Sequence, residues 1–145
     1  MKSIIVIPAR MQSSRLPGKP LIDINGQTLI QRTYNQCAKA FPKERIYIAT
    51  DDTQIESHCK AKNMQVVMTS KNCLTGTDRV AEVAEQIEAD YYINVQGDEP
   101  LMNPKDILDT ESAIQKYKGE VINGYAKVSD EFLYTSLSIP KLVFR

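Results

Sequence analysis

The stretch "IPARMQSSRLPGKPL" (residues 7–21) places three cations, Arg10, Arg15 and Lys19, on a loop that directly follows an apolar run. An arginine guanidinium offers paired N–H donors that match phosphate oxygens, and a lysine ammonium adds a mobile point charge. Because this mixture suits a polyphosphate, the loop is predicted to bind a nucleoside triphosphate. A solvated basic loop between two elements is the alternative that this stretch alone leaves open.

The cationic loop differs from the common phosphate-binding motifs. Pro20 stands where a Walker A loop has the Ser or Thr that begins its helix, and the stretch has no GxGxxG turn. Proline also disfavours the helical conformation at the residue before it, so Lys19 is predicted to project from an extended segment. The sequence therefore predicts a phosphate cradle of another kind.

A pair of acids follows a later apolar run. In "NVQGDEP" (residues 94–100), Asp98 and Glu99 come immediately after Gly97. A carboxylate at the end of a strand suits Mg²⁺, which keeps several waters and bridges to substrate phosphates. Because neighbouring side chains point in different directions, one acid is predicted to bind the metal and the other to support the turn. A simple polar turn is the alternative.

The stretch "TGTDR" (residues 75–79) has the character of a helix start, with Thr77 predicted as the N-cap. Thr75, Thr77 and the free backbone amides there could receive an anion or the polar edge of a base. Arg79 would oppose the helix dipole, which favours a functional role for this cation with Asp78 as its partner. An ordinary Asp–Arg pair on the surface is the alternative.

Apolar patterning predicts the elements that position these residues. Strands are predicted at residues 3–8, 45–50, 65–69 and 91–96, with another near 120–128. Helices are predicted at residues 27–40, 53–62 (capped by Asp51 or Asp52), from Thr77 onward and from the Asn103 cap to about Tyr117, with a helical turn near 129–135. The alternation predicts a single α/β domain over residues 1–145, with a mostly parallel sheet flanked by helices.

The predicted topology also places the polar stretches relative to one another. In an open α/β sheet, ligands bind beyond the carboxyl ends of the strands. The loops at residues 9–19, 69–77 and 97–100 are therefore predicted to converge on one site.

Composition limits the classes of protein that fit this chain. Eighteen basic residues balance eighteen acidic ones among 145, which argues against a protein that follows a nucleic-acid backbone. The apolar run at the N-terminus is too short for a signal peptide or a membrane span, so a cytoplasmic protein is expected. Cys37, Cys59 and Cys73 are widely spaced, and with His58 as the one histidine they indicate neither a disulfide framework nor a zinc site.

Taken together, "IPARMQSSRLPGKPL", "TGTDRVAE" and "NVQGDEP" resemble the sugar-acid cytidylyltransferases, and most closely the 3-deoxy-manno-octulosonate (Kdo) cytidylyltransferase family, also called CMP-Kdo synthetases. The resemblance implies a Rossmann-like, glycosyltransferase-A-type nucleotidyltransferase fold. It implies a Mg²⁺-dependent reaction in which CTP and Kdo give CMP-Kdo and pyrophosphate, for lipopolysaccharide biosynthesis. No protein nucleophile is required.

The resemblance also assigns roles to individual residues of this chain. Arg10 and Lys19 would hold the triphosphate, with Arg15 supporting the same loop. Asp98 would hold Mg²⁺, and Gln96 would face the sugar acid. The nucleotide-binding set further includes residues that would line or adjoin the cytosine pocket: Ala9, Met68, Thr75, Thr77 and Arg79.

The resemblance covers the N-terminal portion of the family's domain, so this chain is expected to be incomplete at its C-terminal end. The family's second metal ligand, further sugar-acid contacts and much of a homodimer interface would lie beyond it. The segment "VINGYAKVSDEFLYTSLSIPKLVFR" resembles a divergent branch whose sugar is 8-amino-Kdo. A nonulosonic acid is another candidate sugar, and a truncated CTP-binding module without activity is the alternative from a different class.

Overall fold

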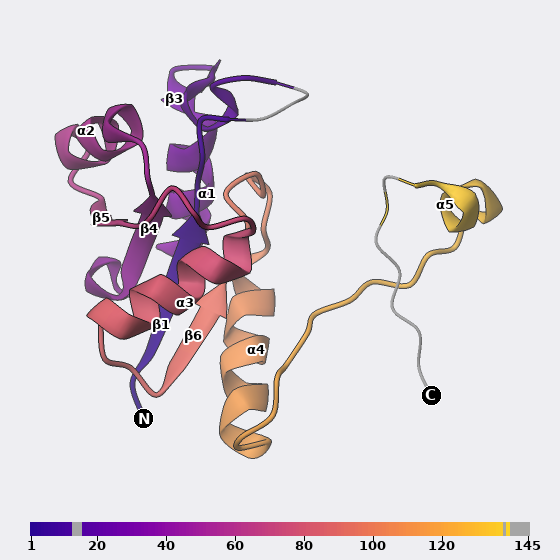
Figure 1. The fold of residues 1–145 in the computed structure, drawn as a ribbon. Helices are drawn as coiled ribbons and strands as arrows, with labels where there is room; N and C mark the ends of the chain where they lie inside the picture. Colours follow the sequence, from indigo (N-terminus) through magenta and orange to yellow (C-terminus); the bar gives the residue numbers. More distant parts are fainter. Residues whose placement is uncertain (13–15, 138, 140–145) are drawn as a thin grey trace.

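The computed structural model describes residues 1–12, 16–137 and 139 (Figure 1). Within these residues lies a four-stranded sheet of order β5-β4-β1-β6, and every neighbouring pair of its strands is parallel. The strands are β1 (Ser3–Pro8), β4 (Ile46–Thr50), β5 (Gln65–Met68) and β6 (Tyr91–Asn94). All four had been predicted from their apolar runs, and their parallel pairing is confirmed.

Strand β1 lies in the middle of the sheet and is buried on both faces. Ile5 and Ile7 point into one core, whereas Ile4 and Val6 point into another, and all four are fully buried. Successive side chains of a strand point to opposite faces, so a strand covered on both sides needs a continuous apolar run rather than an alternating one. The run "SIIVIP" satisfies that requirement.

Helices cover both faces of the sheet. The larger core contains residues of α1 (Leu29–Cys37), α2 (Thr53–Ala61) and α4 (Pro104–Lys116). The smaller core, on the other face, is closed by Val83 of α3 (Gly76–Gln86). The predicted fold class, a mostly parallel sheet flanked by helices, is therefore confirmed.

Caps explain where the helices begin. The Asp52 carboxylate accepts hydrogen bonds from the first amides of α2, and the Asn103 side chain caps α4, as predicted. The predicted N-cap of α3 was wrong, because Thr75 rather than Thr77 takes that position. The Thr75 hydroxyl accepts from the Asp78 amide (3.2 Å) and the Asp78 carboxylate accepts from the Thr75 amide (2.7 Å), a reciprocal box that satisfies two donors.

The cationic loop is more compact than predicted. Lys19 does not project from an extended segment; it begins the 3₁₀ turn η1 (Lys19–Leu21). Gly18 precedes it with a φ of 70°, which lets the chain reverse, and the Leu21 amide then donates to the Gly18 carbonyl (2.9 Å). Pro20 fits in this first turn, where its missing N–H leaves no bond unmade.

The sequence did not predict a short hairpin that lies between this loop and α1. Strand β2 (Asp23–Ile24) pairs antiparallel with β3 (Gln27–Thr28) across Asn25 and Gly26, both of which have positive φ. Asn-Gly is the preferred dipeptide for such a tight turn. The predicted helix at residues 27–40 therefore begins later, at Leu29, with Thr28 as its cap.

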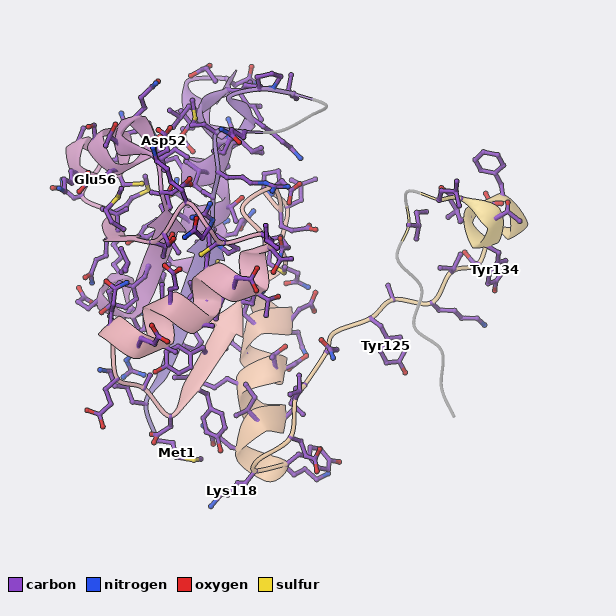
Figure 2. All side chains as sticks on the ribbon, viewed as in Figure 1. Met1, Asp52, Glu56, Lys118, Tyr125 and Tyr134 are labelled. Carbon is purple, nitrogen blue, oxygen red and sulfur yellow. The ribbon has the colours of Figure 1, made fainter. Side chains whose placement is uncertain are left out.

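The prediction for residues 120–128 was wrong. The structure shows no strand there among the described residues, and the segment runs away from the sheet after α4 (Figure 1). Tyr125 lies on it at a distance from the main body, as does Tyr134 on α5 (Glu131–Thr135) (Figure 2). A strand needs a neighbouring edge for its backbone groups, so apolar residues alone do not create one. The short helix α5 was predicted as a turn near 129–135.

Helices that could cross a membrane are absent from the described part of the chain.

The three cysteines are free thiols. Burial in the larger core raises the pKa of Cys37 and of Cys59 to about 12. Desolvation, together with a 3.1 Å hydrogen bond from its Sγ to Glu82, raises the pKa of Cys73 to about 11. All three groups therefore stay protonated at neutral pH.

We expect these thiols to be unreactive in the folded protein, because the thiolate is the nucleophile. At pH 7.5 the folded chain should react with a disulfide reagent at least about tenfold more slowly than free glutathione. The measurement is the absorbance of the released thiolate, repeated in denaturant to count the thiols that unfolding exposes. A rapid native reaction at one thiol per chain would contradict the assignment for Cys73, the least buried of the three.

Candidate functional site

Neighbouring hollows lie at the carboxyl ends of the strands. The hollow that we call the Asp98 hollow has a volume of about 580 Å³, and its lining includes Ala9, Arg10, Lys19, Gln96, Gly97 and Asp98. The Asp51 hollow has a volume of about 320 Å³, and its lining includes Arg10, Asp51, Asp52, Lys71, Cys73 and Arg79. The predicted convergence on one site is observed only in part, because residues of the loop at 97–100 line the Asp98 hollow and residues of the loop at 69–77 line the Asp51 hollow, with Arg10 of the first loop in both.

A direct ion pair joins the two predicted centres of charge in the Asp98 hollow. The Lys19 Nζ lies 2.5 Å from the Asp98 Oδ2, although the residues are 79 positions apart in the chain. Their side chains remain 38% and 48% exposed, so both groups can be reached from solvent. A phosphate could replace the carboxylate as the partner of Lys19, and a cation could replace the ammonium as the partner of Asp98.

Close packing fixes the loop that carries Asp98. A Cβ placed on Gly97 would lie 2.7 Å from the Pro8 carbonyl oxygen, so this residue approaches the end of β1 more closely than any side chain permits. On the other side, the buried Thr33 hydroxyl donates to the Gly97 carbonyl (3.1 Å) and the Gln36 side chain donates to the Pro100 carbonyl (3.3 Å). Helix α1 and strand β1 therefore hold the loop from two directions.

Arg10 occupies the junction of the hollows, because it lines both. The residue before it, Ala9, is buried, and its amide donates to the Ala49 carbonyl (2.9 Å), which extends the pairing of β1 with β4 by one residue. The backbone is therefore hydrogen-bonded to the sheet up to Ala9, and the exposed Arg10 follows directly.

Arg79 is buried in the wall of the Asp51 hollow. Its side chain donates to the Asp51 carboxylate (2.7 Å), the Thr69 hydroxyl (2.6 Å) and the Ser70 carbonyl (3.3 Å). The predicted partner, Asp78, was wrong, because the reciprocal cap with Thr75 occupies that carboxylate. Hydrogen bonds from the Thr75 backbone and side chain are the main reason that the pKa of Asp78 is lowered.

Of the remaining predicted residues, some line a hollow, some lie outside both hollows and one lies outside the described residues. Gln96 lines the Asp98 hollow, where its side-chain amide donates to the Asn94 side chain (3.3 Å). Met68, Thr75 and Thr77 are exposed near the same edge of the sheet but do not line either hollow. Arg15 lies outside the described residues.

Sequence reasoning missed the contribution of residues 51–53. Asp51, Asp52 and Thr53 line the Asp51 hollow at the end of β4, and Figure 2 shows Asp52 at the start of α2. The signal was present in the sequence, because "ATDD" follows a predicted strand and residues after strand ends form the site of an open α/β sheet. Asp52 had been assigned a cap only.

The described residues can be compared with the ligands that the expected Mg²⁺ would need. They contain no cluster of three or more His, Cys, Asp or Glu side chains that could hold a metal by themselves. Asp98 instead offers one solvent-accessible carboxylate beside Lys19 and near Arg10. This donor set fits Mg²⁺, which is commonly bound by one or two carboxylates together with substrate phosphates and waters.

Comparison with known proteins gives the family of this chain. The profile of the family described as "Cytidylyltransferase" matches residues 4–136. The chain belongs to this family.

Individual relatives show which kind of cytidylyltransferase the chain is similar to. The chain is 46% identical to the 3-deoxy-manno-octulosonate cytidylyltransferase of Escherichia coli over 106 residues, which are 73% of this chain and 43% of that protein. It is 43% identical to the enzyme of the same name from Protochlamydia amoebophila, over 95% of this chain and 55% of that protein. A solved structure of CMP:2-keto-3-deoxy-manno-octonic acid synthetase complexed with CTP superposes with a TM-score of 0.78 at 41% identity, covering 82% of this chain and 49% of that chain. The chain thus spans about half the length of the relatives it matches.

Proposed function

We propose that this protein transfers CMP from CTP to the anomeric hydroxyl of a Kdo-type sugar acid and releases pyrophosphate. The observation that carries the proposal is the meeting of Arg10, Lys19 and Asp98 in one hollow at the carboxyl edge of the sheet. The named activities of its relatives and the CTP in the solved synthetase complex support the same substrates.

In the proposed reaction, the cations of the first loop act on the phosphates. Lys19 exchanges Asp98 for a phosphate oxygen, and the guanidinium of Arg10 binds the triphosphate from the junction of the hollows. The anomeric hydroxyl attacks the α-phosphorus in line and gives up its proton to water, while the bond to the pyrophosphate breaks and the leaving group gains negative charge. Arg10 and Lys19 stabilise that charge through hydrogen bonds between ionised groups.

Asp98, once released from Lys19, would hold Mg²⁺ through its carboxylate. When bound, the metal ion would supply positive charge that polarises the phosphate and lowers the pKa of a bound hydroxyl. Gln96 lines the same hollow, and its amide is suited to hydrogen bond a hydroxyl or carboxylate of the sugar acid. We propose lipopolysaccharide biosynthesis as the use of the product and the cytoplasm as its location.

The first test is pyrophosphate release from CTP and Mg²⁺ with and without Kdo. Release that depends on Kdo is expected, and 8-amino-Kdo and a nonulosonic acid should be tested in the same assay to identify the preferred sugar. CTP binding by calorimetry without release with any sugar would favour a CTP-binding module and contradict the transferase.

Lys19→Ala provides a separate prediction. The apparent KM for CTP should rise and kcat should fall, with a combined loss of roughly tenfold to a hundredfold in kcat/KM, because one hydrogen bond between charged groups is worth about 1.5–3 kcal/mol. The measurement is initial rate against CTP concentration. The matched control is Lys105→Ala, because Lys105 pairs with Asp109 at the same 2.5 Å on the exposed surface of α4. Equal kinetics for the two variants would remove Lys19 from the triphosphate site.

A further inference from the structure

We infer that Thr33 and Gln36 of helix α1 are positioning residues for Asp98, a role that rests on the proposed function. The Thr33 hydroxyl donates to the carbonyl of Gly97, the residue directly before Asp98 (3.1 Å). This bond fixes the peptide that carries the proposed metal carboxylate. Thr33 and Gln36 are not among the residues that line either hollow, so their effect on substrate is exerted through Asp98.

The burial of Thr33 indicates that its hydroxyl serves more than packing. The residue is 0% exposed, and a buried hydroxyl costs free energy unless it forms hydrogen bonds. A threonine inside a helix commonly donates to the carbonyl four residues earlier, which here is the Leu29 carbonyl at 3.3 Å. The Gly97 carbonyl is the nearer acceptor for the single hydroxyl proton. The bond to the distant loop therefore explains why a hydroxyl stands at this core position.

A second bond from α1 holds the other end of the same turn. Gln36, three residues after Thr33, donates through its Nε2 to the Pro100 carbonyl (3.3 Å). Residues three apart lie on the same side of a helix, so both side chains reach residues 97–100 from one surface. Asp98 thus lies between two carbonyls that α1 holds.

The same helix also holds the segment that carries Lys19. The Leu29 amide, at the start of α1, donates to the Ile22 carbonyl (3.0 Å), and the Ile22 amide donates to the Lys19 carbonyl (3.3 Å). Helix α1 therefore contacts the segments of both partners in the Lys19–Asp98 ion pair. The placement of the turn at 97–100 on α1 sets the position of the carboxylate relative to the ammonium.

This arrangement predicts which ligand Thr33 affects. In the proposed complex the triphosphate meets Lys19 and Arg10, and the Thr33 bond does not involve their loop. Asp98 must instead meet a cation that is also bound to phosphate, and a small displacement weakens such a contact strongly. Loss of the Thr33 hydroxyl should therefore reduce the effect of Mg²⁺ on CTP binding and leave CTP binding without metal unchanged.

The test is calorimetry of CTP binding in the absence of a sugar acid, so that no turnover occurs. Each chain is titrated with CTP in a chelator and again at saturating Mg²⁺, and the ratio of the two Kd values is the metal gain. We expect Thr33→Val to lower the metal gain by about threefold to tenfold, the usual worth of one hydrogen bond, while the Kd without metal changes less than about twofold. Asp98→Asn should lower the metal gain at least as far.

Thr33→Ser separates positioning from a loss of packing. Serine keeps the hydroxyl but lacks a buried methyl group, so this variant should be less stable than the unaltered chain and yet keep its metal gain within about twofold. Thr33→Val keeps the buried shape and should lose the metal gain. Thermal unfolding of each variant gives the fraction folded at the temperature of the titration.

Two further variants complete the set. Gln36→Ala removes the bond to Pro100 from a partly exposed position and should lower the metal gain by about threefold, so it decides the inference if Thr33→Val fails to fold. Thr110→Val is the matched control, because the Thr110 hydroxyl donates to the Asp106 carbonyl four residues earlier on α4 (2.7 Å), away from the hollows. This control should change neither Kd.

Each outcome decides between the inference and the proposed function. An unchanged metal gain in folded Thr33→Val, an equal loss of CTP affinity with and without metal, or an equal loss of metal gain in Thr33→Ser would overturn the inference. An unaltered chain that binds CTP without any metal gain would overturn the inference and the metal role of Asp98, and would leave the triphosphate site intact. An unaltered chain that binds no CTP would overturn the proposed function together with the inference.

Discussion

Asp98→Asn is expected to lower kcat for pyrophosphate release by about 10²–10³-fold, the loss typical when a group that stabilises transition-state charge is removed. Asparagine keeps the shape of the side chain but loses the charge that would hold Mg²⁺ and that pairs with Lys19 in the free protein. Because the carboxylate is about half exposed, its contribution to folding is small, at roughly 0–1 kcal/mol. The Asp98→Asn variant should therefore lose most of its activity and keep most of its stability.

The measurement combines initial rates over a range of Mg²⁺ concentrations with denaturant unfolding. Asp109→Asn is the matched control, because that acid also pairs with a lysine at 2.5 Å and is 61% exposed, but lies on α4 away from the hollows. The control should keep its full rate. Full activity of Asp98→Asn, with the same response to Mg²⁺, would exclude Asp98 from the mechanism.

Gly97→Ala is expected to impair both folding and catalysis by adding one methyl group. The new Cβ would lie 2.7 Å from the Pro8 carbonyl oxygen and 3.2 Å from the Ile30 Cδ1, and the first of these contacts involves backbone that cannot rotate away. Overpacking of this kind costs about 1–3 kcal/mol of unfolding free energy. Relief by a shift of the loop would move Asp98, so kcat should fall by about 10²-fold, as for other small misplacements of a reacting group.

Unfolding midpoints in denaturant and pyrophosphate release measure the two effects on the same preparations. Gly124→Ala is the control, since a Cβ at that position meets no atom within 4 Å. Its stability should lie within about 0.5 kcal/mol of the unaltered chain. If Gly97→Ala were as stable and active as Gly124→Ala, the close approach to β1 would have no role in placing Asp98.

Elements with a local signal could be predicted from sequence, and those that depend on distant partners could not. The run "SIIVIP" predicted β1, and the Asn103-Pro104 start predicted α4, because burial on both faces and capping are local requirements. The apolar residues of 120–128 predicted a strand that is absent from the described segment, because a strand also needs an edge with which to pair. Lys19 was predicted in an extended segment because Pro20 follows it. The structure instead places it at the start of a 3₁₀ turn, which the positive φ of Gly18 allows.

The sequence by itself determined which residue types the proposed site contains, and those in the cationic loop and in "GDEP" are types that suit phosphates and Mg²⁺. The tertiary structure alone decided which of these groups meet. The pairing of Lys19 with Asp98 depends on β6 lying beside β1. The pairing of Arg79 with Asp51 depends on α3 packing against β1 and β4, which brings its first turn to the residue that follows β4. Strand order and register arise from burial of the whole sheet, so contacts between its ends cannot be read from any one stretch of the chain.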